Sequence, residues 1–473
     1  MQLSAVTTLI ILLSGCLHIM EAQPEKRPDL RVGLNITGGM PGDIPFWLLA
    51  NRNGIPGSGR SAAYLRISAD TPLHPDRLLD YAAGFDLIGR QDGQNSAWFN
   101  QLYLHVRYGP VRIYGGRIKE AHGMHDPWLS SGSLGWSHNA TPMPKIGLRI
   151  PDWLSVPYTK DFIAVRGHIA HGWFGDNRYT ARPWLHEKSG YVKLGGQNIF
   201  NVYGGLMHYT VWGGEHPELG NLPGKFTDFK RVFLVKSGHE NAPPGEDDYM
   251  LGDHLGAWDA GFMINLGRFH TSVYRQFPLE TKDNLKLKSP QDGLLGISIA
   301  SANQQSLLSA ITYEFLYTKW QDGPRRPDPG NFRDGEKGNE NYYNHFLYRS
   351  GWTYFGRTLG NPLFFPRDDG PGIENNRIVA HHLGAGGAIS PAFSYRTLIT
   401  YSRNYGTYGT VEEPRGEDYP YYHGLTQFSF LLETQTLLPY LSDLYFNAAF
   451  AADTGQLYSN NAGVWLGIQK VIR

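Results

Sequence analysis

The chain has 473 residues, and 43 Lys and Arg residues balance 43 Asp and Glu residues, which excludes a general electrostatic attraction to nucleic acid or to an anionic membrane. Aromatic residues reach 13% and charged residues only 18%, a mixture unlike that of disordered chains or coiled coils. The mean hydropathy of -0.38 is too polar for a bundle of membrane helices, whereas the strands of a membrane barrel need to be only half apolar.

The N-terminus carries an apolar run at residues 5–13 that has the length of a signal-peptide core and is too short to span a bilayer. Two processing schemes fit: residues 1–22 form a signal peptide, or residues 1–15 are removed and Cys16 is lipidated. Cys16 is the only cysteine, so neither scheme permits an intramolecular disulfide. An exported chain of this length without disulfides indicates a bacterial envelope.

Residues 23–60 are interpreted as an N-terminal periplasmic segment with one short helix. The helix is expected within Asp43–Asn51, where an Asp and an early Pro precede apolar residues and Gly54 follows. From about Ser61 onward, alternating polarity replaces the helical period, so residues 61–473 are predicted to form a β-barrel.

The alternation is clearest in residues 98–108, 307–320 and 393–403, where one face is apolar and the other carries Arg, Glu, His or Thr. A soluble sandwich fits such strands too, but aromatic residues near strand ends, such as Trp98 and Trp212, are typical of the interface girdles of membrane barrels. With about ten residues in each strand and roughly fifteen in each connection, the chain predicts an all-β, antiparallel transmembrane barrel of about 18 strands.

Long polar connections are expected at residues 119–160, 213–256, 321–345, 360–377 and 404–423. Connections of this length without structure are unusual unless they have a task. Barrels of the bacterial outer membrane place their long loops outside the cell. We therefore expect these segments on the outer surface.

Several short phrases, distributed over most of the chain, carry a family resemblance: Ile44–Asn51, Gly115–Lys119, Ser130–Leu134, Ser137–Ala140, His186–Lys188, Gly204–His208, Val211–Gly214 and Tyr274–Phe277. Their order resembles that of the Wzi family of capsule assembly proteins. The resemblance implies an outer-membrane barrel of about 18 strands, with outer loops that restrict the pore and short helical segments that plug or cap it. It also implies a role in attaching or organising capsular polysaccharide at the cell surface.

Two predicted loops combine flat aromatic rings with charged groups, as sugar binding requires. The candidate polysaccharide-binding residues are Trp320, Arg325, Arg326, Asp328, Tyr342, Tyr343, His345, Arg367, Asp368 and Asp369. The alternative is that these are ordinary solvated loops whose aromatic residues pack on one another.

A second candidate set is predicted on the polar faces of the strands, where it would line the lumen: Arg107, Arg166, His168, Glu314 and Arg396. These residues could guide an acidic polymer. The alternative is that they form ion pairs across the lumen that hold the barrel walls together.

No metal site or cofactor is predicted. His168 and His171 are three residues apart in a probable strand, which places them on opposite faces, and His122 and His125 lack evident partners. The sequence Ser131-Gly132-Ser133-Leu134-Gly135 lacks the first glycine of a serine nucleophile elbow and has no strand-to-helix context.

The sequence thus predicts a non-enzymatic, monomeric outer-membrane protein that contacts membrane lipids, binds extracellular polysaccharide and helps to attach or organise it as capsule, with no nucleic-acid partner. A porin for oligosaccharides is the alternative, and a barrel acyl hydrolase is less favoured. Both alternatives share the predicted fold.

Overall fold

The computed structural model describes residues 28–472, apart from 58, 75, 240, 241, 244, 247–249, 282–286, 288, 324, 325, 328–335, 338, 339, 369, 410–413, 420 and 422. For residues 326, 327, 336, 337, 409 and 414–419 it describes the backbone alone. The predicted signal peptide, in either version, lies outside the described residues and stays a prediction.

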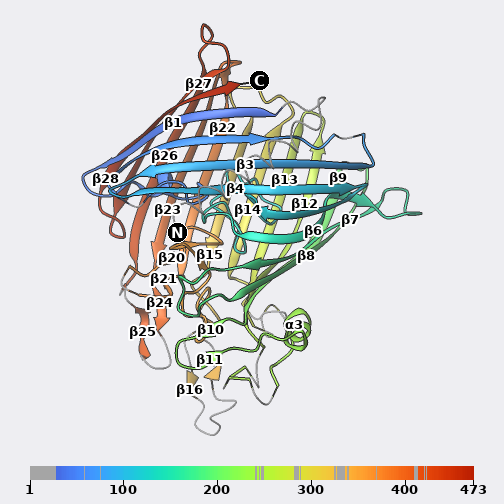
Figure 1. Ribbon diagram of the computed structural model, residues 1–473, viewed down its shortest axis with the longest axis vertical. Coiled ribbons are helices and arrows are strands. Elements are labelled where there is room, and N and C mark those ends of the chain that lie inside the picture. Colours follow the sequence, from blue (N-terminus) through green and yellow to red (C-terminus); the bar gives the residue numbers. More distant parts are fainter. Residues whose placement is uncertain are drawn as a thin grey trace, which may run out of the picture.

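Eighteen strands form one closed antiparallel sheet (Figure 1). The first nine are β1 (Asp29–Met40), β2 (Ser61–Asp70), β3 (Leu79–Gln91), β4 (Asn95–Tyr108), β5 (Val111–Arg117), β6 (Pro144–Ser155), β7 (Ile163–Trp173), β8 (Trp184–Leu194) and β9 (Phe200–Trp212). The others are β12 (Asp253–Leu266), β13 (Phe269–Leu279), β14 (Gly293–Ser301), β15 (Ala310–Tyr317), β22 (Ile378–Ser390), β23 (Phe393–Asn404), β26 (Leu425–Leu437), β27 (Leu444–Gly455) and β28 (Asn461–Ile472). Strand β1 pairs with β28, from Leu30 opposite Ile472 to Met40 opposite Ala462, which closes the barrel. The predicted fold class is confirmed.

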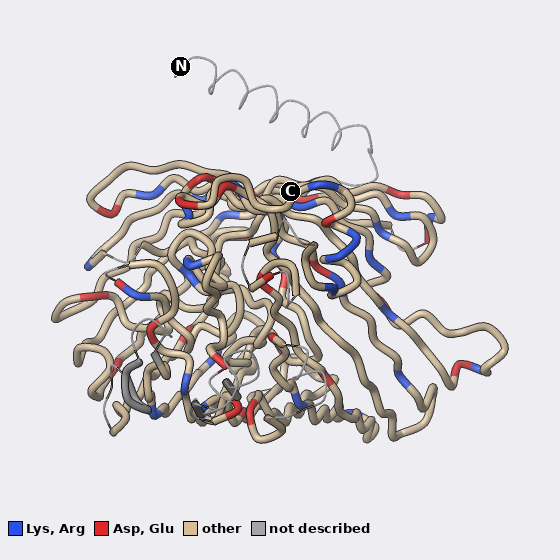
Figure 2. The backbone as a smooth tube through the Cα atoms, turned by 90° about the horizontal axis from the view of Figure 1, so that it is seen from below, with Lys and Arg blue, Asp and Glu red and all other residues tan. Residues whose placement is uncertain are grey.

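The two faces of the strands differ as the alternation predicts. On β15, Tyr313 is exposed on the outer surface, whereas Thr312 and Glu314 are buried in the lumen. On β1, Leu34 and Ile36 are exposed on the outside. Since alternate residues of a strand share a face, this pattern gives the barrel an apolar outer surface, while the inner face carries polar residues together with buried apolar ones such as Leu316. Lys, Arg, Asp and Glu are interspersed along the backbone (Figure 2).

The two ends of the barrel differ in the length of their connections. Because the number of strands is even and neighbours are antiparallel, the start of β1 and the end of β28 lie at the same end of the barrel. We call this the turn end. Short turns such as 267–268 and 391–392 lie there. The connections 41–60, 118–143, 213–252, 318–377 and 405–424 all lie at the other end, the loop end.

Small elements decorate the loop end. They are the helices α2 (Phe46–Leu49) and α3 (Phe226–Phe233) and the strands β10 (Glu215–His216), β11 (Gly220–Asn221), β16 (Arg326–Pro327), β17 (Glu336–Lys337), β18 (Thr353–Tyr354), β19 (Arg357–Thr358), β20 (Phe365–Pro366), β21 (Ile373–Asn375), β24 (Thr407–Gly409) and β25 (Pro414–Tyr419). Within the described residues, no helix combines the length and apolar character needed to cross a bilayer.

Segments of three loop-end connections fold back into the lumen, and we call the described residues of 41–60, 118–143 and 340–377 together the plug. Leu134 and Trp136 of the second connection and Tyr342 and Trp352 of the third belong to one buried cluster that includes residues of the barrel wall. Around α2, Trp47 and Leu48 form a second cluster with Leu398, Leu431, Ala449 and Ala451 of β23, β26 and β27. The prediction of short helical segments and loops that plug the barrel fits this arrangement.

The predicted boundary at residue 61 is wrong. Asp29–Met40 forms the first barrel strand, and the helical segment that follows it lies at the loop end, not at the turn end. Three glycines, Gly33, Gly38 and Gly39, interrupt the apolar alternation of this strand and hide it in the sequence.

Two further predictions fail at irregular strands. The expected loop 119–160 contains β6, whose pairing with β7 shifts register between Ile150 and Leu154. In β4, a shift opposite Asp86 and Leu87 leaves Asn100 without a direct partner, so the face reverses at that residue. Trp98 therefore turns to the interior at the loop end, although the alternation placed it on the lipid side with Leu104.

Candidate functional site

A cleft of about 1090 Å³ opens at the loop end, above the plug. We call it the outer cleft. It is assembled from all three plug connections, the loop-end tips of β3, β4, β5, β27 and β28, residues 457–459 between the last two strands, and residue 421 of the connection 405–424. Its aromatic lining consists of Phe46, Trp98, Phe355, Phe364, Phe365, Tyr421 and Tyr458.

The aromatic rings of the outer cleft pack on one another at one side. Phe46 and Tyr458 are stacked, with centroids 5.7 Å apart and an interplanar angle of 15°, and Phe365 lies 5.9 Å from Tyr458. Phe355 leaves 60% of its surface exposed at the rim. Flat rings of this kind suit the apolar faces of sugar rings.

Three arginines, Arg90, Arg117 and Arg357, supply positive charge to the outer cleft. Arg357 donates to the backbone oxygens of Leu49 and Pro56, both at 2.8 Å, and so ties the third plug connection to the first. Burial and the neighbouring Arg90 lower the pKa of Arg357 to about 10, so it stays charged at neutral pH.

Among the described residues, no carboxylate forms an ion pair with Arg117 or Arg357, while Arg90 pairs with Asp92 at 2.9 Å. Guanidinium groups without an internal acid can bind a carboxylate or hydroxyl of a ligand in bidentate fashion. The cleft also contains the acids Asp43, Asp368, Glu374 and Asp453. Glu374 accepts a hydrogen bond from Tyr421 at 2.6 Å, so part of this acidic set is already used.

The structure separates the predicted polysaccharide-binding residues. Asp368 lines the outer cleft and is exposed. Arg367 is half-buried nearby, and its backbone N–H donates to Gly372 at 3.0 Å. Arg325, Asp328 and Asp369 and the side chain of Arg326 lie outside the described residues.

The sequence suggested that Tyr342 and Tyr343 are exposed and bind sugar rings, but the structure does not place them there. The Tyr342 hydroxyl donates to Asp292 at 2.9 Å, and that of Tyr343 donates to the backbone oxygen of Leu134. Both rings are buried in the plug. Because distant segments of the plug cover both rings, they are out of reach of a ligand. For these two residues the alternative applies, in which the aromatic residues of the loops pack internally.

Trp320 and His345 also make internal contacts. The Trp320 backbone N–H donates to Asp292 at 3.1 Å, and His345 Nδ1 accepts from the backbone of Leu347 at 3.2 Å. The His345 ring stacks on Phe346 with centroids 4.5 Å apart. Neither residue lines the outer cleft.

The predicted lumen residues point inward, and each makes contacts inside the barrel. Glu314 accepts hydrogen bonds from the Ser130 hydroxyl at 2.6 Å, the Ser131 backbone at 2.7 Å and the Tyr274 hydroxyl at 2.6 Å. Arg396 pairs with Glu433, and Arg107 donates to the backbone oxygens of His74 and Arg77. Arg166 lies over Tyr191 at 4.7 Å. These contacts fit the alternative that such residues hold the barrel and plug together.

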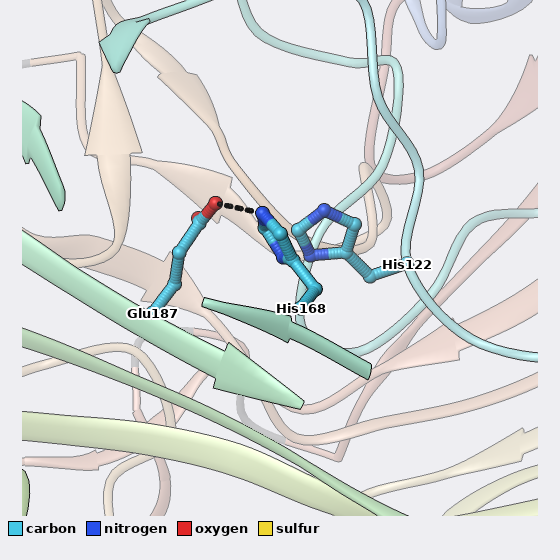
Figure 3. Close-up of side chains that lie close together, drawn as sticks. All are labelled: His122, His168 and Glu187. Carbon is cyan, nitrogen blue, oxygen red and sulfur yellow. Dashed lines mark ion pairs between the residues drawn. The ribbon is translucent and has the colours of Figure 1, made fainter. Parts of the chain in front are cut away.

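His122, from the plug, meets His168 of β7 and Glu187 of β8 in the lumen, with their potential metal-ligand atoms all within 4.8 Å of one another (Figure 3). The sequence gave no partner for His122. However, Lys145 Nζ lies 3.0 Å from Glu187 and 2.6 Å from Glu120. The ammonium group of Lys145 already neutralises the Glu187 carboxylate. A metal ion bound here would have to displace this ammonium group or lie close to its positive charge.

A smaller cavity of about 290 Å³ borders this cluster and is lined by Lys119, Glu120, His122, Arg149, Arg166, His168 and Tyr191, among others. Its cations are partly balanced, since Arg149 lies 3.5 Å from Glu120 and Lys119 lies 2.6 Å from Asp86. The two cavities therefore differ: the inner one is bounded by paired charges and the outer one by aromatic rings and arginines.

The comparisons agree with this architecture. The family model of the capsule assembly protein Wzi matches residues 48–367. The chain belongs to the Wzi family. The protein is thus an outer-membrane β-barrel. Because barrels of this membrane place their long loops outside the cell, we expect the loop end to face outward.

Among solved structures, the chain resembles Wzi of Escherichia coli, described as an outer membrane protein involved in group 1 capsule assembly and a carbohydrate-binding β-barrel. The match has 13% identity and a TM-score of 0.55 and covers 93% of this chain and 83% of that one. OccK5 (OpdH) of Pseudomonas aeruginosa matches with 9% identity and a TM-score of 0.47, covering 94% and 98% of the two chains. At such identities, the first likeness concerns the fold alone. No curated protein sequence matches the chain.

Most of the residues that line the outer cleft are not among the candidates predicted from the sequence. Phe46 lies in the phrase that carried the family resemblance, but its segment was placed in the periplasm. Trp98 was assigned to the lipid girdle. The structure brings the Arg90 guanidinium to 5.1 Å from the Trp98 ring, but the two residues are eight positions apart and no local sequence signal marks their contact.

Proposed function

We propose that the outer cleft binds extracellular polysaccharide without chemical change and thereby holds it at the cell surface as capsule. The observation that carries this proposal is a cleft of about 1090 Å³ at the outer end, lined by aromatic rings together with Arg117 and Arg357. Aromatic faces would stack on sugar rings, and the arginines would bind hydroxyl groups or acidic substituents. Family membership and the carbohydrate binding of the Escherichia coli Wzi barrel support the same reading.

A single barrel holds the polymer only weakly through this cleft, whereas a cell surface with many barrels holds it strongly. Each barrel, acting as a monomer, contributes a few contacts, and many copies in one membrane hold the same long polymer. Detachment then requires many sites to open at once. This proposal needs no covalent bond between the polymer and the protein.

Binding is favoured over catalysis by the surroundings of the serine-rich plug segment. The Ser133 hydroxyl donates to Gln276 at 3.2 Å, and the Ser131 hydroxyl donates to Glu314 at 2.6 Å. Both serines are buried. These hydroxyls anchor the plug to the wall, so we assign them no role as nucleophiles.

The first test compares Phe355→Ala/Phe365→Ala with Phe346→Ala. Phe346 is 52% exposed at the same end but does not line the outer cleft, which makes it a matched control. With polysaccharide purified from the host's own culture, we expect the cleft variant to bind about 30-fold more weakly, because the two rings contribute on the order of 1 kcal/mol each. Equal affinity of all proteins would contradict the assignment of the cleft.

The second test is made in the host. Deletion of the gene should leave polymer synthesis intact and release polymer into the medium, and the wild-type gene should restore cell-bound polymer better than the cleft variant does. Because the plug packs against the inner wall in two buried clusters, we expect reconstituted barrels to show little conductance. Normal polymer retention with slower sugar uptake and high conductance would replace attachment by a porin function.

A further inference from the structure

The outer wall of the barrel is covered by protein at one place. Near the turn end of β9, Val202 is 39% exposed on the outer surface. Trp212 lies on the same face, since it is ten residues further along the alternation, yet it is only 4% exposed. His186 of β8, on the outer face with the exposed Val192, is buried as well. The loop-end part of this wall is therefore shielded from lipid.

The shield includes helix α3. The ring of Phe229 lies 5.6 Å from Trp212 and 5.2 Å from His186, and Val232 is buried in the same cluster. Lys188, which also faces outward, donates from Nζ to the backbone oxygen of Phe233. Helix α3 thus lies outside the barrel against β8 and β9, at the lower right in Figure 1.

The opposite face of α3 is apolar and basic. Phe226 is 70% exposed and Leu234, directly after the helix, is 57% exposed. Lys230 stands between them at four-residue spacing, so the three form one stripe, and its Nζ lies 5.0 Å from the Phe226 ring. Lys225 and Lys236, just outside the ends of the helix, are exposed as well.

Within the described part of the chain, the lysines of this stripe and beside it, Lys225, Lys230 and Lys236, are not paired with acids. Asp228, the acid of the helix, is buried, accepts the Lys225 backbone N–H at 2.7 Å and lies 3.3 Å from His239. The exposed side of α3 therefore presents cations and large apolar groups together.

We propose that α3 is an interfacial helix that binds the phosphate-bearing glycolipids of the outer leaflet. Phe226 and Leu234 enter the acyl boundary, and Lys225, Lys230 and Lys236 contact the phosphates of the headgroups. A helix with an apolar side and flanking lysines lies in the plane of the interface, and lysine stems reach along apolar surface to a charged headgroup. The position fits, because Trp173, Trp184 and Trp212 mark the outer end of the wall beside it.

This contact is independent of the outer cleft. Helix α3 belongs to the connection 213–252, which contributes no residue to the cleft. Lipid bound there would hold the loop end of the barrel at a fixed depth in the membrane. A polymer bound in the cleft would then be held at a fixed height above the lipid.

The test titrates the purified full-length barrel in detergent with diphosphoryl lipid A and follows lipid adducts by native mass spectrometry. Lys225→Gln/Lys230→Gln/Lys236→Gln is compared with Lys160→Gln, an exposed lysine in the turn 156–162 at the opposite end. Each cation near an anionic surface contributes roughly five-fold in affinity, so the triple variant should bind diphosphoryl lipid A on the order of 100-fold more weakly than the wild type does. The control should match the wild type.

Two further arms identify the ligand. Lipid A without phosphates should bind the wild type as weakly as lipid A binds the triple variant. Phe226→Ala/Leu234→Ala should also bind diphosphoryl lipid A more weakly, while inorganic phosphate in excess should not displace it. Equal affinity of the triple variant, or displacement by inorganic phosphate, would overturn the proposal. Heat-modifiable migration on gels would confirm that every variant is a folded barrel.

Discussion

The plug and the outer cleft are made largely of the same connections at the same end of the barrel, yet they use their polar residues in opposite ways. Where the plug meets the wall, Glu314 of β15 and Asp292, just before β14, each accept several hydrogen bonds from serine, tyrosine or backbone donors. In the cleft, Arg117 and Phe355 leave their binding surfaces open. The contrast indicates that internally satisfied groups here fix the shape of the barrel, while groups left open at the rim are available to a ligand.

The largest effect is expected from Lys145→Met, which leaves the buried Glu120 and Glu187 without their cation. We expect a loss of about 3–5 kcal/mol in the free energy of unfolding, measured by guanidinium titration in detergent. The variant should also gain stabilisation by Zn²⁺, because His122, His168 and Glu187 then no longer face the ammonium group of Lys145. Zinc stabilisation of the wild type to the same extent would show that Lys145 does not block a metal.

Glu314→Ala should separate the plug from the wall. It removes the acceptor of Ser130, Ser131 and Tyr274 and leaves buried donors unsatisfied, at a cost of about 3 kcal/mol. Hydrogen exchange in residues 126–137 should rise, and the conductance of reconstituted barrels should rise with it. Thr312→Ala, on the same inner face, is the control and should leave the exchange of this segment near that of the wild type.

The pH dependence should follow Asp292, which lies outside the barrel strands. Burial raises the pKa of its carboxyl group to about 6, from 3.8 in the unfolded chain. As the pH rises, the Asp292 carboxyl group therefore loses its proton at a lower pH in the unfolded state than in the folded state. The stability that this group contributes is complete below pH 3.8 and is lost as the pH rises through 6. We expect about 2 kcal/mol less protection of residues 318–323 at pH 7.5 than at pH 4, by hydrogen exchange corrected for intrinsic rates. Asp292→Asn should remove most of the difference, and an unchanged dependence would exclude this carboxyl group.

The smallest effect distinguishes plug from cleft most directly. Tyr343→Phe removes one buried hydroxyl that donates to Leu134 and accepts from Asn361. Stability should fall by about 1 kcal/mol, while affinity for polysaccharide stays unchanged. Phe355→Ala should leave stability unchanged and lower the affinity for polysaccharide. A large loss of affinity in Tyr343→Phe would show that the two regions are not separate.

The sequence predicted the barrel because most strands keep a strict alternation. In β15, Tyr313 faces lipid and Glu314 faces the lumen, as expected. The alternation fails where glycines dilute it, as in β1, or where a register shift reverses it, as at Asn100. A single inserted residue moves every later side chain to the other face, and nothing local in the sequence marks the position.

The candidate site was less predictable, because burial in the loops depends on distant partners. Tyr343 is buried against Leu134, which is 209 residues away. An aromatic residue in a polar loop can equally pack inward or face a ligand, and only the path of the other connections decides between them. Asp368 was placed correctly by its position in a loop, and its role in binding stays a prediction.

The outer cleft joins the two ends of the chain. Its lining includes Phe46, just after the first strand, and Tyr458, just before the last, and the Phe46 backbone donates to Asp453 at 2.7 Å across 407 residues. Contacts between such distant segments form late, since the loop between their ends is long. Competence to bind should therefore appear only when β28 has paired with β1, so a barrel that is stalled during insertion would carry no finished cleft.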